Sequence, residues 1–229
     1  YDLNFHNIAI QDGRLPKLND FNVAMFLSWD PKKRATCGFE GRFMEPWYRS
    51  PEEMQNHIDD GIDGILLDEK IDVYSLGNIL WGILTGKPPW KKDKDPIAMD
   101  ELRPRVARGE LPELPSRFAN STDPTIVAIR DAMFKCLRVN PEERASAGEV
   151  AHDLKLAMIE VKRLEKEEKK KKKEAEKIKK AEEAAAKELK LEEERKKKEA
   201  EEAAAKAFDK EGADMSEQLL ARRQELMMT

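Results

Sequence analysis

The most apolar stretch of the chain lies between residues 72 and 84, and its pattern is that of a buried helix. The sequence there, DVYSLGNILWGIL, is apolar on nearly every side of a helix, so other elements must cover it. The stretch is too short to cross a bilayer, and we expect it inside a folded domain. Gly86 and the two prolines after Lys87 predict its end. The positions that we expect to be buried are Val73, Leu76, Ile79, Leu80 and Ile83.

Three further segments have helical patterns. Ser50-Pro51-Glu52-Glu53 combines a capping serine, a proline in the first turn and two acids suited to the helix dipole. Residues 124–137 and 149–164 have apolar positions at helical spacing, and NPEERAS at 140–146 is typical of a capped connection between them.

A short β-ribbon is predicted near the start of the chain. Ile8 and Ile10 precede Asp12-Gly13, a strong hairpin signal, and residues 15–18 follow as the second strand. Residues 28–50 have little periodicity, which predicts a long loop of functional or disordered character. The expected fold class is therefore mainly α, with a small β-ribbon, over residues 1–158.

The chain changes character after residue 158. Between residues 160 and 202, 32 of 43 side chains are charged. We predict a charged helix rich in Lys, Glu and Ala at 159–211, and a short amphipathic segment at 212–229. Gly212 is expected to break the helix between these two parts.

The spacing of the apolar residues in this charged tail does not decide whether it has a partner. Leu164, Ile178, Leu189 and Leu191 do not keep a heptad, which favours a solvated single helix. A coiled coil with a partner helix and a disordered tail are the alternatives. The lysine run 169–173 has glutamates around it, which favours a solvated face over contact with acidic lipid or RNA.

Length, charge and cysteine content limit the class of protein. The 229 residues allow one domain with a sizeable core, and the net charge of −4 argues against a dedicated nucleic-acid binder. Cys37 and Cys136 cannot form a disulfide framework, so we expect an intracellular, cytoplasmic protein with no membrane segment in this chain. The chain begins at Tyr1 rather than a methionine, and we expect it to be a fragment.

Five short motifs follow one another along residues 1–158. They are YDLNFHN at 1–7, NDFN at 19–22, RSPEE at 49–53, DVYSLGNILWGILTGKPPW at 72–90 and CLRVNPEERAS at 136–146. Their order and spacing resemble the C-terminal lobe of eukaryotic protein kinases. The resemblance implies an upstream lobe with a glycine-rich loop and a lysine–glutamate pair. The chain alone is then expected to be inactive, because half of the nucleotide cleft is missing.

The resemblance also implies roles for four polar residues near the start. Asp2 and Asn7 have the Asp-x-x-x-x-Asn spacing, with Asp2 as catalytic base and Asn7 as a magnesium ligand. Asp20, in Asp-Phe-Asn, matches the second metal ligand. Asn4 stands on the nucleotide side, where serine/threonine kinases place a lysine. The implied cofactors are ATP and Mg²⁺, since phosphoryl transfer needs oxygen ligands for the metal on the phosphates.

Three further residues match the structural support of the family. Glu52 is expected to form an ion pair with Arg144. Without this pair, a charged side chain would be buried without a partner. Asp72 is expected to accept hydrogen bonds from the backbone of the catalytic loop, residues 1–7.

Four residues depart from the family pattern. Asn22 replaces a glycine that adopts positive φ, which asparagine also tolerates. Tyr1 replaces the arginine that receives an activation-loop phosphate, which argues against switching by phosphorylation. Asn4 cannot supply the charge of the lysine, and Glu45 replaces the threonine or proline that indicates the acceptor class.

Two functions are therefore compatible with the sequence. The first is a protein kinase that transfers the γ-phosphate of ATP to a hydroxyl of a protein substrate. The alternative is a pseudokinase that acts as a nucleotide-binding or scaffolding module. The sequence of the upstream lobe would discriminate between them.

Overall fold

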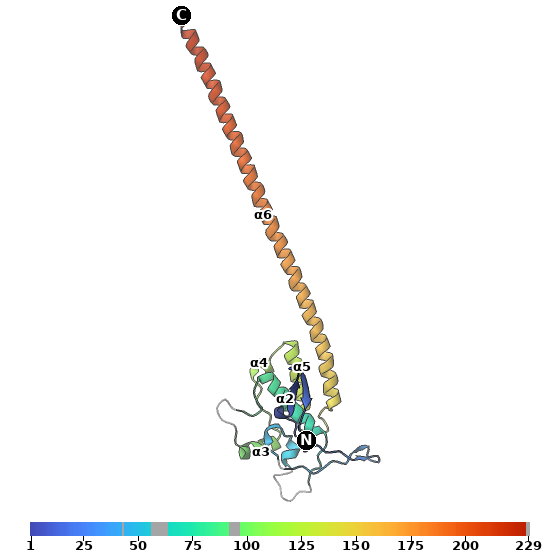
Figure 1. Cartoon of the computed structure of the whole chain (residues 1–229). Helices are drawn as coiled ribbons and strands as arrows, with labels where there is room; N and C mark the ends of the chain where they lie inside the picture. Colours follow the sequence, from blue (N-terminus) through green and yellow to red (C-terminus); the bar gives the residue numbers. More distant parts are fainter. Residues whose placement is uncertain (43, 56–63, 92–96, 228–229) are drawn as a thin grey trace. The chain divides into compact units, whose positions relative to one another are not determined.

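The computed structural model describes residues 1–42, 44–55, 64–91 and 97–227 (Figure 1). The chain is mainly helical with two small antiparallel sheets, so the predicted fold class is confirmed. It divides into two compact units, Tyr1–Leu164 and Glu165–Thr229. The first unit extends a few residues beyond the expected boundary at 158.

The core of the first unit lies between α2 (Lys70–Thr85) and α5 (Pro124–Cys136). Gly77 of α2 allows the close approach, since a Cβ there would lie 2.7 Å from Leu137 Cδ2. As predicted, α2 ends at Gly86, which adopts a left-handed conformation with φ of 72°. The buried members of this core are Val73, Tyr74, Leu80, Trp81, Leu84, Ala132, Met133, Cys136, Leu137 and Val150.

One of the five burial predictions for α2 is wrong. Val73, Ile79 and Leu80 are buried and Leu76 is half-buried, but Ile83 is 56% exposed. A run that is apolar on every side indicates burial without showing which side stays open, and Ile83 lies on the open side.

A second apolar cluster joins α1 (Pro51–Gln55) and α3 (Met99–Ala107). The predicted start of α1 is confirmed, with Ser50 N–H donating to Glu53 Oε2 at 2.9 Å, which is one half of a capping box. Neither α3 nor the short α4 (Ser116–Ala119) was predicted from the sequence. The cluster contains Met54, Trp90, Ile97, Leu102, Val106 and Ala107.

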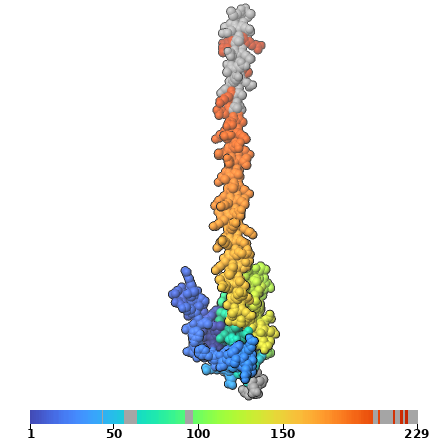
Figure 2. Space-filling model, turned by 90° about the vertical axis from the view of Figure 1, so that its right-hand side faces the viewer, coloured from blue at the N-terminus to red at the C-terminus, as the bar shows by residue number. Residues whose placement is uncertain are grey.

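The predicted β-ribbon is present as β1 (Ile8–Gln11) and β2 (Leu15–Leu18). Asp12 and Gly13 make its turn with φ of 51° and 66°. The ribbon projects from the surface of the first unit (Figure 2). The region predicted as a long loop also holds a small hairpin, β3 (Trp29–Asp30) with β4 (Ala35–Thr36), and a 3-10 turn, η2 (Pro46–Tyr48).

The last element is α6 (Ala147–Met227), which begins at a capping box in which Ser146 N–H donates to Glu149 Oε2 at 2.7 Å. The expected break at Gly212 is wrong, because α6 continues through it. A single glycine costs about 1 kcal/mol relative to alanine, which the strong helix formers on both sides can offset. Pairing of α6 with a partner helix stays a prediction. None of the helices in the described ranges combines the length and the apolar content that a membrane span requires.

Candidate active site

The loop of residues 1–7 is held by its own side chains and by α2. It ends in η1 (Phe5–Asn7), and Asn4 Oδ1 caps this turn by accepting from His6 N–H at 2.8 Å and Asn7 N–H at 3.2 Å. The Phe5 ring packs edge-on against Tyr48 and lies where a Cβ on Gly82 would be, 2.3 Å from the nearest ring atom. Phe5 therefore seats the loop directly on the backbone of α2.

The carboxylate of Asp2 accepts three side-chain hydrogen bonds. Asn4 Nδ2 donates to Oδ1 at 3.1 Å, Arg49 Nη2 also donates to Oδ1, and Asn7 Nδ2 donates to Oδ2 at 3.1 Å. An ionised carboxylate has about four acceptor sites, so one site remains, on Oδ2. That site is suited to a hydroxyl that must be oriented or deprotonated.

Asn7 is half-buried and lines the pocket described below. Its Nδ2 donates to both Asp2 O, at 2.8 Å, and Asp2 Oδ2, which fixes the orientation of the amide. Among the described residues nothing donates to Asn7 Oδ1. The oxygen is therefore available to a cation or a polar ligand.

Asp20 approaches the same site from the segment after β2. Asn19 N–H donates to Asn7 O at 2.8 Å, which ties the two segments together. Asp20 itself has φ of 57° and accepts from Asn22 N–H at 3.3 Å. The positive φ is found at Asp20 and not at Asn22, although Asn22 lies within the turn that Ala24 N–H closes by donating to Phe21 O at 3.0 Å.

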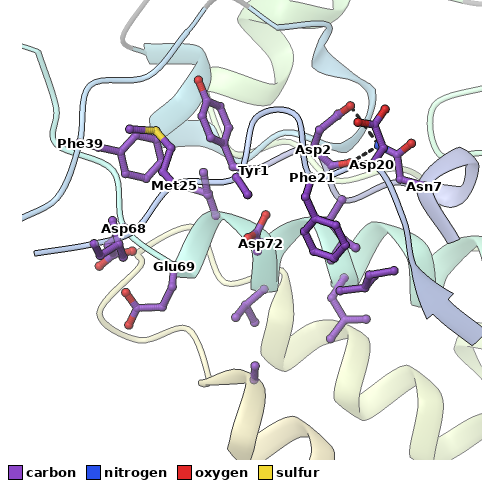
Figure 3. A pocket seen from close by; sticks show the side chains of 18 of the residues that line it. Tyr1, Asp2, Asn7, Asp20, Phe21, Met25, Phe39, Asp68, Glu69 and Asp72 are labelled. Carbon is purple, nitrogen blue, oxygen red and sulfur yellow. Dashed lines mark hydrogen bonds between the residues drawn. The ribbon is translucent and has the colours of Figure 1, made fainter.

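These three residues line one pocket of about 450 Å³, and Figure 3 shows Asp2, Asn7 and Asp20 together at one end of it. Asp68, Glu69 and Asp72 line it farther along. Asn4 does not line the pocket, because its amide is used within the loop. The other lining residues are mostly apolar: Tyr1, Leu3, Leu18, Asn19, Phe21, Ala24, Met25, Leu27, Phe39, Ile71, Val73, Leu76 and Ala147.

The donor set at this end of the pocket fits a hard cation only in part. Asp20 and Asn7 offer a carboxylate and an amide oxygen, which magnesium prefers. Over the ranges that the structure describes, no group of three or more His, Cys, Asp or Glu residues is arranged to hold a metal ion. Magnesium here would need further oxygen ligands from water or from a phosphorylated compound.

Arg49 is the site residue that the sequence did not reveal. Its buried guanidinium donates to Tyr1 O at 3.0 Å and to Asp2, and lies 3.7 Å from Glu53 Oε1. It thus connects the loop of Asp2 to helix α1. One feature of the sequence could have indicated this role. Arg49 directly precedes Ser50-Pro51-Glu52, the start of a buried helix, and a buried arginine needs carboxylate partners.

Glu53 is a buried acid beside this arginine. Both Ser50 N–H and Ser50 Oγ donate to its Oε2 at 2.9 Å. Burial raises the pKa of the Glu53 carboxyl to about 7, although Arg49 and Ser50 oppose the rise. The carboxyl is therefore protonated in the folded chain at pH values where the unfolded chain has released the proton.

We expect Glu53→Gln to flatten the pH dependence of stability. Because the folded pKa is above the ordinary value of 4.5, this carboxyl makes the free energy of unfolding fall as pH rises from about 4.5 to 7. The stability of the wild type relative to Glu53→Gln should drop by an amount on the order of 3 kcal/mol between pH 5 and pH 8. Urea denaturation at both pH values measures this change. The variant Glu113→Gln, at an exposed glutamate, serves as control. If the stability of the wild type relative to Glu113→Gln dropped equally between these pH values, the pH dependence could not be assigned to Glu53.

The predicted ion pair between Glu52 and Arg144 is present. Arg144 Nη1 donates to Glu52 Oε1 at 2.6 Å and Nη2 to Oε2 at 3.0 Å. The remaining three N–H groups donate to the carbonyls of Arg138, Lys70 and Val139. All five guanidinium donors are thus paired in a side chain that is 1% exposed.

The hydrogen bonds expected for Asp72 are absent. In the described part of the chain, no backbone N–H of residues 1–7 donates to its carboxylate. The backbone nitrogen of Tyr1 donates to Val23 O at 3.0 Å, and Arg49 donates to Tyr1 O. These two contacts fix the loop, while Asp72 is exposed and lines the pocket.

Comparison of the sequence with known proteins shows similarity to one family. The family model described as "Protein kinase domain" matches residues 1–154. Serine/threonine-protein kinase SBK1 of Mus musculus is 31% identical over 157 residues, 67% of this chain and 34% of that protein. Mitogen-activated protein kinase kinase kinase 1 of Arabidopsis thaliana is 30% identical over 149 residues, 65% of this chain and 21% of that protein.

A third relative shows the same partial coverage. The phosphorylase b kinase gamma catalytic chain, liver/testis isoform, of Homo sapiens is 27% identical over 146 residues, 64% of this chain and 32% of that protein. The chain thus spans about a third or less of the length of these relatives.

Proposed function

This chain belongs to the protein kinase domain family, and on that basis we propose that the intact protein transfers the γ-phosphate of ATP to a hydroxyl of a protein substrate. The observation that carries the proposal is the convergence of Asp2, Asn7 and Asp20 on one pocket from two separate segments. Phosphoryl transfer depends on positioning and charge stabilisation, and these three side chains supply both kinds of group.

Each residue has a distinct role in this proposal. Asp2 orients the acceptor hydroxyl and takes its proton through the one free acceptor site on Oδ2. Asn7 Oδ1 and the Asp20 carboxylate would hold Mg²⁺, which neutralises the phosphate charge when it is bound. Arg49 positions Asp2 and does not meet the substrate.

One observation favours a second function, a pseudokinase that binds nucleotide or a partner protein without turnover. Asn4 stands where serine/threonine kinases have a lysine, and its amide caps η1 and holds Asp2 instead. No charge reaches the phosphate from this position, which would slow the transfer step.

The test is an assay of the intact protein with Mg²⁺-ATP and a peptide library containing serine, threonine and tyrosine acceptors. A kinase should bind ATP only with magnesium present and transfer phosphate to a subset of peptides. Magnesium-dependent ATP binding without any transfer would support the pseudokinase. Failure to bind nucleotide at all would contradict both the transfer and the nucleotide-binding functions.

A further inference from the structure

Six lysines of α6 lie on one side of the helix and form what we call the lysine face: Lys166, Lys169, Lys170, Lys173, Lys177 and Lys180. Successive residues of an α-helix are about 100° apart, so these six fall within a sector about 100° wide. All six are exposed and lie within the second unit, Glu165–Thr229. By the same spacing, every glutamate between residues 165 and 183 falls outside the sector. The glutamates that surround the lysine run in the sequence are therefore on other sides of the helix.

The lysine face is also short of internal ion pairs. Off the face, Lys172 pairs with Glu168 at 2.6 Å and Lys179 with Glu183 at 3.9 Å. On the face only Lys180 has such a partner, Glu176 at 2.7 Å, and the other five have none among the described residues. The face therefore carries uncompensated positive charge over a length of about 21 Å.

We propose that the lysine face binds the surface of a bilayer that contains anionic lipid headgroups. Each lysine near such a surface strengthens binding about fivefold, and clusters of four to eight basic residues on a helix are typical of this binding. The face contains no apolar side chain, and the apolar Ile178 falls on another side of α6. The helix should therefore lie at the level of the headgroups, without inserting, and its binding should depend on salt.

The width of the lysine face favours a flat partner over a groove. A planar surface meets only one sector of a helix, which matches the arrangement of these lysines. The major groove of a nucleic acid has phosphates along both walls. Glu174 and Glu176 fall about 80° to either side of Lys166 and would face those walls. A partner helix is disfavoured too, because a coiled coil needs an apolar seam where this face has lysines.

The experiment is sedimentation of the full 229-residue chain with vesicles. We expect binding to phosphatidylcholine vesicles with about 30% phosphatidylserine at low salt, loss of that binding in about 0.5 M salt, and none to pure phosphatidylcholine. The triple variant Lys170→Gln, Lys173→Gln and Lys177→Gln should weaken binding on the order of 100-fold. Free phosphoserine at millimolar concentration should not displace the chain.

The matched control is the triple variant Lys171→Gln, Lys172→Gln and Lys179→Gln, which changes the net charge equally on the other side of α6. Both variants are compared at about 0.1 M salt, where the Debye length of about 10 Å is close to the diameter of the helix. The control should then weaken binding by about tenfold or less, because its charges are partly screened across the helix. Circular dichroism should show that both variants keep their helix content. Equal weakening by the two variants, binding to pure phosphatidylcholine, or tighter binding to duplex RNA than to anionic vesicles would each overturn the proposal. The test is independent of phosphoryl transfer.

Discussion

Asp2→Asn in the intact protein should lower the rate of phosphoryl transfer by about 10²–10⁴-fold, the usual contribution of a positioned acid–base group. ATP binding should change little, because Asp2 is proposed to act on the acceptor hydroxyl. Asparagine can still accept from Arg49 through Oδ1, and Asn7 Nδ2, which loses Asp2 Oδ2 as acceptor, keeps its bond to Asp2 O, so the loop should keep its place. The measurements are steady-state transfer to a peptide substrate and the affinity for Mg²⁺-ATP.

Two further variants sharpen this prediction. Asp20→Asn should remove the charged ligand and weaken magnesium-dependent ATP binding as well as transfer. Asp12→Asn makes the same chemical change in the β1–β2 turn, outside the pocket, and should leave both quantities unchanged. An Asp2→Asn protein with full transfer activity would reject Asp2 as the base. Weakened transfer in the Asp12→Asn control would point to a general effect on folding.

Arg144→Leu should lower the free energy of unfolding by about 3–5 kcal/mol, because it leaves the Glu52 carboxylate buried without its counter-charge. Three backbone carbonyls lose their donor in the same step. Urea denaturation monitored by tryptophan fluorescence would measure the change, since Trp81 and Trp90 lie in the two cores.

A double-mutant cycle isolates the ion pair in this prediction. Glu52→Leu with Arg144→Leu should cost less than the sum of the two single changes, since the double variant buries no unpaired charge. Lys135→Ala breaks the exposed pair with Asp153 in the same unit and should lower the free energy of unfolding far less than Arg144→Leu does, since solvent screens that pair. Equal costs for Arg144→Leu and Lys135→Ala would contradict the importance of burial.

The features that the sequence predicted well are those with a strong local signal. The run from residue 72 to 84 is apolar on all sides and is followed by Gly86, so α2 and its end could be located. Asp12-Gly13 fixed the turn of the β-ribbon by its tolerance of positive φ. The pair of Glu52 and Arg144 came from the family resemblance, because no local pattern connects residues so far apart.

The features that the sequence did not predict depend on packing. Helix α3 contains Pro104, which disfavours a helix interior, and forms because Leu102 and Val106 pack against Met54. The exposure of Ile83 could not be read from a run without a polar side. Contacts of Arg49 with Asp2 exist only once α1 and the first loop are brought together.

Gly82 has a consequence for how substitutions in this chain should be interpreted. A methyl group at residue 82 would lie 2.3 Å from the ring of Phe5, so even alanine must displace Phe5 from α2. Phe5 belongs to the same turn as Asn7, and the displacement would carry into the site. A survey of variants that inspects only pocket-lining residues would score Gly82→Ala as harmless. The substitution would nevertheless alter the site, because it moves Phe5 and with it the turn that holds Asn7.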